Sequence, residues 1–178
     1  MEIGTVNHRR IQLAYYDSPC GRLAVGAYGG GICICDWTTG NRAENTLRRI
    51  VRYLPMPAED AFDETLLEKA VGILEDYFKG NRRYIDLPLT LCGTPFQRKV
   101  WEALRWIPYG KTSTYKDIAD AVSLPRGVRA VGAAIGANPL SILIPCHRVI
   151  GVDGSLTGFA GGIEAKKYLL GLEQMVVL

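Results

Sequence analysis

Strand-type hydrophobic runs near the start of the chain constrain the fold most strongly. Short apolar runs alternate with the turn signals Ser18-Pro19 and Gly29-Gly30. Runs of this length, separated by turns this short, are typical of an antiparallel meander. We therefore predict three strands, at Ile11–Tyr15, Arg22–Tyr28 and Gly31–Trp37.

Helical spacing replaces the strand pattern after this sheet. Apolar residues recur at intervals of three and four over Ala43–Tyr53 and over roughly Phe62–Lys79, where Gly80 ends the second helix. Tyr84–Leu87 is expected to add a last strand. The composition then changes at Pro88–Gly93, so we predict one domain over residues 1–92 and a second over residues 93–178.

The second half opens with helix start signals. Thr94, Pro95 and Gln97 have the spacing of a capping box with proline at the first helical position. Thr114 and Asp117 mark the start of a second helix, and a third is expected over about Gly127–Ala137. Helices joined by short turns in this way have the outline of a helix-turn-helix module.

The third of these helices carries unusually small side chains on part of its surface. A helix this bare can approach another backbone closely, either inside the protein or in a DNA groove. The residues alone leave both interpretations open. The small residues are Gly132, Ala133, Gly136 and Ala137.

Positive charge is concentrated in the same half of the chain. The segment Pro95–Arg148 holds eight Lys and Arg against three Asp and Glu, a net charge of 8 − 3 = +5. The whole chain carries +3, so the remainder carries 3 − 5 = −2. This asymmetry favours a phosphate-backbone partner for one half only, although an ordinary solvated surface would explain the charge equally well.

Cysteine and apolar content bound the cellular setting. The five cysteines form neither an even set nor Cys-x-x-Cys pairs, and there are only two histidines. We therefore expect free thiols, no disulfide framework and no metal. The apolar runs are far shorter than the roughly 20 residues that a membrane span needs, so a cytoplasmic protein without a membrane partner is expected.

The segment Ile142–Ile150 places three reactive side chains inside an apolar run. Cys146, His147 and Arg148 follow one another between Pro145 and Val149. A lone cysteine in apolar surroundings is ordinarily an inert core residue. Polarisable or cationic neighbours such as His147 and Arg148 can instead stabilise a thiolate, which is the nucleophilic form.

The sequence resembles the O6-alkylguanine-DNA alkyltransferases, also called methylated-DNA–protein-cysteine methyltransferases. The resemblance covers about Thr94–Glu173, and six motifs occur in the family's order, which is a very specific match. They are Thr114-Tyr115, Arg129-Ala130-Val131-Gly132, Asn138-Pro139, Pro145-Cys146-His147-Arg148-Val149, Gly158-Phe159-Ala160-Gly161-Gly162 and Tyr168-Leu169-Leu170 with Glu173.

The resemblance implies an α/β (α+β) fold. A ribonuclease-H-like α/β domain would precede a C-terminal domain of the winged helix-turn-helix type that binds DNA and carries the reaction. The implied activity is that of a methylated-DNA–protein-cysteine S-methyltransferase, which takes an alkyl group from O6-alkylguanine in double-stranded DNA once per molecule. No cofactor is expected. A monomer is expected, and the sequence leaves open whether copies cluster on DNA and whether O4-alkylthymine is repaired.

The resemblance also assigns catalytic roles. Cys146 would be the nucleophile, His147 would remove the thiol proton through a water, and Glu173 would orient the imidazole. Tyr115 would donate toward a ring nitrogen of the departing guanine. Asn138 would hold the active-site turn together.

Substrate contacts follow from the same motifs. Arg129 would take the place of the flipped base, with Ala130 and Gly132 on the helix that enters the minor groove. The carbonyls of Cys146 and Val149 would accept from the guanine amine, and the Ala160 amide would meet O6. Phe159 and Ala160 stand where some relatives carry tyrosine and serine, so we expect altered substrate preference and inhibitor sensitivity.

Three other functions compete with this interpretation. A damage-binding relative without repair activity would commonly replace the reactive cysteine with tryptophan, which Cys146 contradicts. A cysteine hydrolase would need Cys146 and His147 to reach one electrophile from adjacent positions. A helix-turn-helix transcription factor would need a polar base-reading face, which the small residues of the third helix cannot supply.

Overall fold

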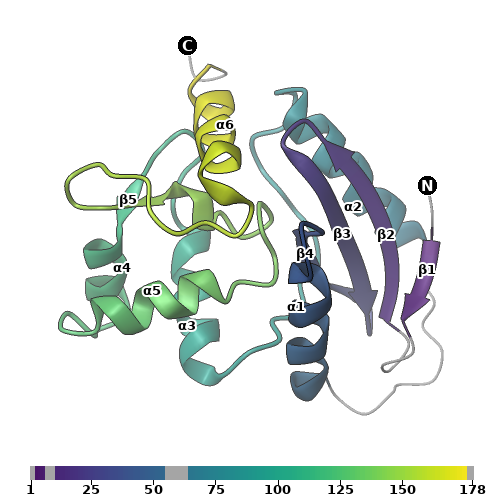
Figure 1. Ribbon diagram of the computed structural model, residues 1–178, viewed down its shortest axis with the longest axis horizontal. Coiled ribbons are helices and arrows are strands. Elements are labelled where there is room, and N and C mark those ends of the chain that lie inside the picture. The colour runs from purple at the N-terminus through teal and green to yellow at the C-terminus, as the bar shows by residue number, and fades with distance from the viewer. Residues whose placement is uncertain (1–2, 7–10, 55–63, 176–178) are drawn as a thin grey trace. The chain divides into compact units, whose positions relative to one another are not determined.

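The computed structural model describes residues 3–6, 11–54 and 64–175, and the chain divides into two compact units (Figure 1). Met1–Cys92 forms the first unit and Gly93–Leu178 the second. The first combines a sheet with helices and the second is mainly helical. The expected mixed α/β class is confirmed. None of the helices in the described ranges is both long and apolar enough to cross a membrane.

The sheet of the first unit is an antiparallel meander in the order β1-β2-β3-β4, and this confirms the predicted topology. Gly29 and Gly30 both have positive φ, at 58° and 78°, as the tight turn between the last two strands requires. One edge strand was not predicted, because its four residues are too few to show a period. The strands are β1 (Ile3–Val6), β2 (Ile11–Ser18), β3 (Gly21–Tyr28) and β4 (Gly31–Trp37).

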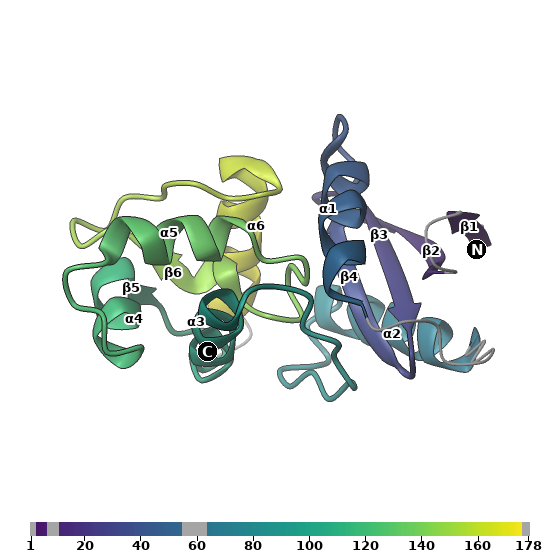
Figure 2. The same ribbon diagram turned by 90° about the horizontal axis from the view of Figure 1, so that it is seen from below.

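Two helices pack on this sheet (Figure 2). Helix α1 (Arg42–Ile50) lies along β4 and continues as a 3-10 turn, η1 (Val51–Tyr53). Helix α2 (Glu64–Phe78) contacts β2 and β3. Both helices were predicted, although residues 62 and 63 of the second prediction lie outside the described residues. Leu47 and Ile50 of α1 join Ile11 and Leu13 of β2 in one buried cluster.

The strand expected at Tyr84–Leu87 is wrong. Of these four residues only Leu87 is buried, so no apolar face exists that could add to the sheet. The chain instead forms backbone hydrogen bonds with β4 a few residues further along. The Ile32 amide donates to the Pro88 carbonyl at 2.8 Å, and the Thr90 amide donates to the Ile32 carbonyl at 2.9 Å.

The second unit contains the predicted helix-turn-helix outline. The predicted capping box is present, with the Thr94 hydroxyl accepting from the Gln97 amide at 3.2 Å. The helix start predicted at Thr114 and Asp117 also forms a capping box, in which the Thr114 hydroxyl accepts from the Asp117 amide at 3.1 Å. Helix α5 packs against both α3 and α4. The helices are α3 (Pro95–Arg105), α4 (Tyr115–Ala121), α5 (Val128–Gly136) and α6 (Gly162–Met175).

A short parallel pair of strands joins distant parts of this unit. Strand β5 (Ser113–Thr114) pairs with β6 (Val149–Ile150), which directly follows the 3-10 turn η2 (Cys146–Arg148). The pairing brings the start of α4 beside the Cys-His-Arg segment. Neither strand was predicted, because two residues carry no readable alternation.

Candidate active site

A strained turn leads into the Cys-His-Arg segment. Ile142 has a φ of 72°, a left-handed conformation that a β-branched residue rarely adopts. The buried Asn138 side chain closes this turn from both sides: its amide donates to the Ile144 carbonyl at 3.0 Å, and its carbonyl accepts from the Leu140 amide at 3.0 Å. The Asn138 side chain therefore joins the two ends of this turn.

Cys146 begins the 3-10 turn η2 and is 5% exposed. Its amide donates to the Ile144 carbonyl at 2.8 Å, and its carbonyl accepts from the Val149 amide. Its backbone is therefore held on both sides of the side chain. A thiol held this rigidly, with a small exposed fraction, can meet only an electrophile that is brought into the protein.

His147 and Glu173 form a buried pair. The imidazole Nε2 lies 2.8 Å from the Glu173 carboxylate, and both side chains are at most 1% exposed. Burial lowers the pKa of His147 below its ordinary value, an effect that the hydrogen bond to Glu173 only partly offsets. The imidazole is therefore neutral near pH 7. Since Nε2 faces the carboxylate, a proton arriving from the thiol would be taken by Nδ1.

Arg148 contacts the same carboxylate, which differs from its expected role beside the thiolate. Its guanidinium donates to both Glu173 oxygens at 2.9 Å and to the Ile107 carbonyl at 2.6 Å. Arg148 supports Glu173 instead.

Donors from three residues converge on Glu173. Besides His147 and Arg148, the Gly110 amide donates to its second oxygen at 3.0 Å. Burial by itself opposes ionisation, but the hydrogen bonds from His147 and Arg148 lower the pKa of Glu173 to about 2. The carboxylate is therefore ionised under all ordinary conditions and can fix the orientation of the imidazole.

Tyr115 is placed by the first turn of α4, immediately after its N-cap residue. Its hydroxyl donates to the Thr157 carbonyl at 3.1 Å. Its ring passes beside Gly132 of α5, where an added Cβ would lie 3.7 Å from the nearest ring atom. The contact with Thr157 connects helix α4 to the loop that carries Phe159 and Ala160.

The loop before α6 carries two of the predicted substrate contacts. The Phe159 ring lies edge-on to the His147 ring, with centroids 6.4 Å apart and an interplanar angle of 75°. Ala160 follows it and is half-buried. Val149 is buried in β6, and its carbonyl accepts a hydrogen bond at 2.6 Å from Lys166.

Lys166 was missed by the sequence analysis. It projects from α6, is 0% exposed and also donates to the Thr157 carbonyl at 2.9 Å. A lysine between Ala165 and Lys167 on a helix gives no sign of burial. The signal that could have found it is its spacing of seven residues from Glu173, which places both side chains on one face of the helix.

Known proteins resemble both halves of this chain. A family model described as 6-O-methylguanine DNA methyltransferase, ribonuclease-like domain, matches residues 11–91, and one described as 6-O-methylguanine DNA methyltransferase, DNA binding domain, matches residues 95–175. A methylated-DNA–protein-cysteine methyltransferase of Haemophilus influenzae is 42% identical over 167 residues, covering 93% of this chain and 87% of the relative. The chain belongs to the 6-O-methylguanine DNA methyltransferase family.

Other family members are equally similar over their whole length. The Methanosarcina barkeri methyltransferase is 42% identical, covering 90% of this chain and 97% of the relative. The solved Mycobacterium tuberculosis O6-methylguanine methyltransferase is 39% identical with a TM-score of 0.75, covering 92% of each chain. A structure of the M. tuberculosis protein in complex with DNA is 40% identical with a TM-score of 0.73, covering 91% of this chain and 92% of that one.

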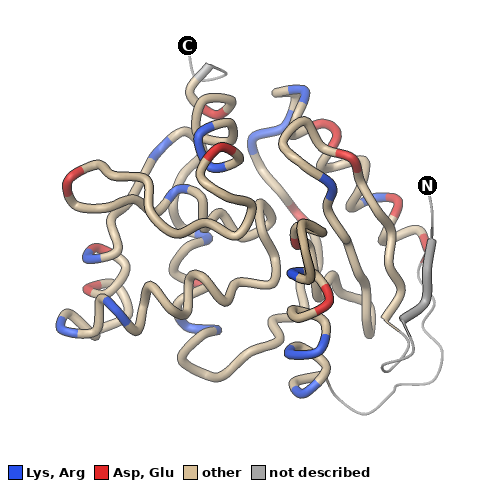
Figure 3. The backbone as a smooth tube through the Cα atoms, viewed as in Figure 1, with Lys and Arg blue, Asp and Glu red and all other residues tan. Residues whose placement is uncertain are grey.

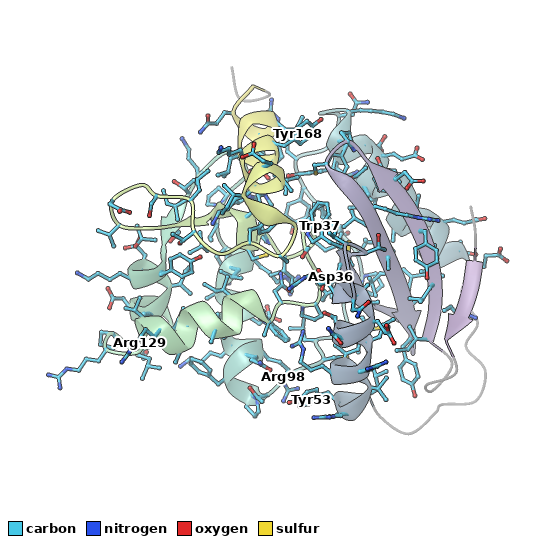
Figure 4. All side chains as sticks on the ribbon, in the orientation of Figure 1. Asp36, Trp37, Tyr53, Arg98, Arg129 and Tyr168 are labelled. Atoms are coloured by element: carbon cyan, nitrogen blue, oxygen red, sulfur yellow. The ribbon has the colours of Figure 1, made fainter. Side chains whose placement is uncertain are left out.

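Within the family's DNA-binding domain, one face of α5 is open. Arg129 and Ala130 are exposed, and Arg129 lies on the outer side of the helix (Figure 4). Arg126 lies in the turn that precedes α5, and Figure 3 shows the Lys and Arg positions of this unit in blue. Ala133 and Gly136 continue the exposed face, and an added Cβ at Gly136 would meet nothing within 4 Å. Two of the four small residues therefore lie on the exposed face of α5 and not in the core of this unit.

All five cysteines are free thiols, and Cys20 is the only one of them that is not buried. Among residues 3–6, 11–54 and 64–175 no group of three His, Cys, Asp or Glu side chains is arranged to hold a metal ion. The polar groups around Cys146 contact one another and the backbone. This arrangement suits nucleophilic chemistry at sulfur.

Proposed function

We propose that Cys146 is the acceptor in the DNA-repair methyl transfer that this chain performs as a family member, and that O6-alkylguanine in duplex DNA is the donor. One observation carries the proposal. Cys146 is held rigidly beside His147, whose imidazole lies 2.8 Å from the ionised Glu173 carboxylate. This arrangement supplies a nucleophile, a neutral base and a group that orients the base.

The reaction would proceed by a single displacement. The thiol proton passes through a water to Nδ1 of His147, and the sulfur attacks the alkyl carbon. The new S–C bond forms as the C–O6 bond breaks, and the electron pair of the C–O6 bond leaves with guanine. The proton is finally returned to guanine, so the products are a thioether on Cys146 and an intact base. The Glu173 carboxylate stabilises the intermediate imidazolium.

Hydrogen bonds to the departing base would lower the barrier. In this proposal Tyr115 donates to the guanine ring, the Ala160 amide meets O6, and the carbonyls of Cys146 and Val149 accept from the exocyclic amine. Each of these carbonyls accepts a hydrogen bond within the protein, and a carbonyl oxygen has two lone pairs. Phe159 would form the apolar wall beside the alkyl group.

Access to the alkyl carbon requires the nucleotide to leave the base stack. We propose that α5 enters the minor groove, where Arg129 fills the vacated space and Ala130 and Gly132 allow close approach. The exposure of Ala133 and Gly136 on α5 supports this orientation, because an added Cβ at Gly136 would meet nothing within 4 Å.

The proposed reaction needs one copy of the chain and no cofactor. Every proposed catalytic group comes from the C-terminal unit of one chain, which supports a monomer acting without cofactor. The thioether product is inert, so each molecule would act once. A nucleophilic thiol must stay reduced, which favours the cytoplasm as its compartment.

Intact mass spectrometry tests the assignment. After incubation with a duplex that contains one O6-methylguanine, the protein should gain about 14 Da on Cys146, saturating at one group per molecule, as covalent capture requires. Cys146→Ser should gain nothing, whereas Cys20→Ser, which changes the least buried thiol, should react like the wild type. A duplex that is bound without any mass change would contradict the assignment.

A further inference from the structure

Lys166 is a fully buried ammonium group to which the reaction described above gives no role. It is 0% exposed, and its Nζ donates to the carbonyls of Val149 and Thr157 at 2.6 and 2.9 Å. Burial lowers the pKa of Lys166, and the nearby Cys146 partly restores it. Burying a cation is costly unless its hydrogen bonds are satisfied, so a position of this kind is a candidate for a functional role.

The two carbonyls held by Lys166 lie at opposite ends of one loop. Val149 directly follows the Cys146 turn, and Thr157 precedes the segment that carries Phe159. Between them the chain folds back on itself, with the Gly151 amide donating to the Ser155 carbonyl at 2.9 Å. Lys166 therefore fixes the distance between the nucleophile segment and the segment proposed to line the alkyl pocket.

The Thr157 carbonyl is shared between two donors. Lys166 reaches it at 2.9 Å and the Tyr115 hydroxyl at 3.1 Å. A carbonyl oxygen has two lone pairs and can accept both. Each donor draws on the same electron density, so the charged ammonium weakens the bond that the phenol makes. It also keeps the carbonyl satisfied if the phenol leaves.

We infer that Lys166 is a positioning residue that acts through Tyr115. The inference rests on the proposed function, in which Tyr115 donates to the departing guanine. As the S–C bond forms and the C–O6 bond breaks, the Tyr115 hydroxyl exchanges Thr157 for the guanine ring nitrogen. Thr157 itself is exposed, but the buried Lys166 stays on its carbonyl oxygen, so this acceptor keeps a protein partner during the exchange. The exchange therefore costs little.

A double-mutant cycle on the single-turnover transfer rate tests the inference. In the wild-type background Tyr115→Phe should slow transfer by about 100-fold, the usual effect of removing one donor to a developing negative charge. In a Lys166→Met background, the slowing of transfer caused by Tyr115→Phe should be smaller by a factor of at least about five, because the two residues act as one unit. Lys167→Met is the matched control: Lys167 pairs with the exposed Glu164 at 2.8 Å. In the Lys167→Met background, Tyr115→Phe should slow transfer as much as it does in the wild type.

Equal effects of Tyr115→Phe in both backgrounds would overturn the inference. If Lys166→Met does not fold by circular dichroism, Lys166→Leu gives the same test, because leucine also lacks a donor. Alkylation of Cys146 by iodoacetamide provides a second readout, because no purine departs in that reaction. A Lys166 change that slows this alkylation as much as transfer would show that Lys166 acts on the thiol and not through Tyr115. Absence of any transfer by the wild type would instead refute the proposed function.

Discussion

The Glu173→Gln substitution tests how much the buried carboxylate contributes to the C-terminal unit. The pKa of Glu173 falls from its ordinary 4.5 to about 2. At about 1.4 kcal/mol for each pKa unit, this difference corresponds to about 3 kcal/mol of folding free energy. An independent route gives a similar figure, because removing one partner of a buried ion pair costs roughly 3 to 5 kcal/mol. The partner left behind would be Arg148.

The pH dependence has a defined sign. The pKa of Glu173 is lower in the folded protein than in the unfolded chain, so its contribution is fully present above pH 4.5 and is lost as the pH falls toward 2. The part of the stability difference that comes from ionisation of Glu173 should therefore be constant from pH 7 to pH 5. Below pH 4.5 it should shrink.

Urea unfolding followed by fluorescence and circular dichroism at several pH values measures this difference. Glu164→Gln is the matched control, because the Glu164 side chain is 87% exposed and pairs with Lys167 at 2.8 Å. Exposed pairs contribute less than about 1 kcal/mol, so the control should unfold like the wild type. A Glu173→Gln variant within 1 kcal/mol of the wild type at pH 7, or a difference that does not change with pH, would refute the reasoning.

Three further predictions address the other parts of the site. Ala133→Leu should leave the melting temperature unchanged but weaken duplex binding, because Ala133 is exposed on α5. The control variant Ala134→Leu changes the next residue, which is buried. It should lower the free energy of unfolding by about 1 to 3 kcal/mol. The transfer rate should stay constant as the pH falls through 6.5, because burial lowers the pKa of His147; a decline centred at or above pH 6.5 would contradict this. Asn138→Ala should lower the free energy of unfolding by about 2 kcal/mol in thermal denaturation, because it leaves a buried amide and a buried carbonyl without partners.

Features encoded over a few neighbouring residues could be predicted from the sequence. The meander over residues 11–37 and the two capping boxes rest on turns and caps that lie within three or four positions of one another. The strand expected at Tyr84–Leu87 failed because its apolar content was too low to require pairing. Strands β5 and β6 could not be predicted, since their pairing connects residue 113 with residue 149.

The contacts of the residues next to the reactive cysteine could not be predicted either, because they too depend on residues far away in the sequence. Adjacency in sequence suggested that Arg148 would act beside the thiol, whereas the turn directs it to Glu173, 25 residues further along the chain. His147 shares that carboxylate, so one acid supports two consecutive basic residues. Spacing alone cannot reveal such convergence, because it depends on how α6 packs against the 3-10 turn.

Helix α6 explains why both Glu173 and Lys166 are difficult to recognise. Lys166, Leu169 and Glu173 are spaced by three and four residues and are all at most 1% exposed. This is the buried stripe of an ordinary amphipathic helix, but two of its three positions carry charges. Hydrophobic periodicity therefore underestimates how deeply α6 is buried, and Glu173 resembles a surface acid near a helix end. A charge is costly at each of these positions, so the two charges point to function: Glu173 holds the imidazole, and Lys166 holds the loop on which Tyr115 rests.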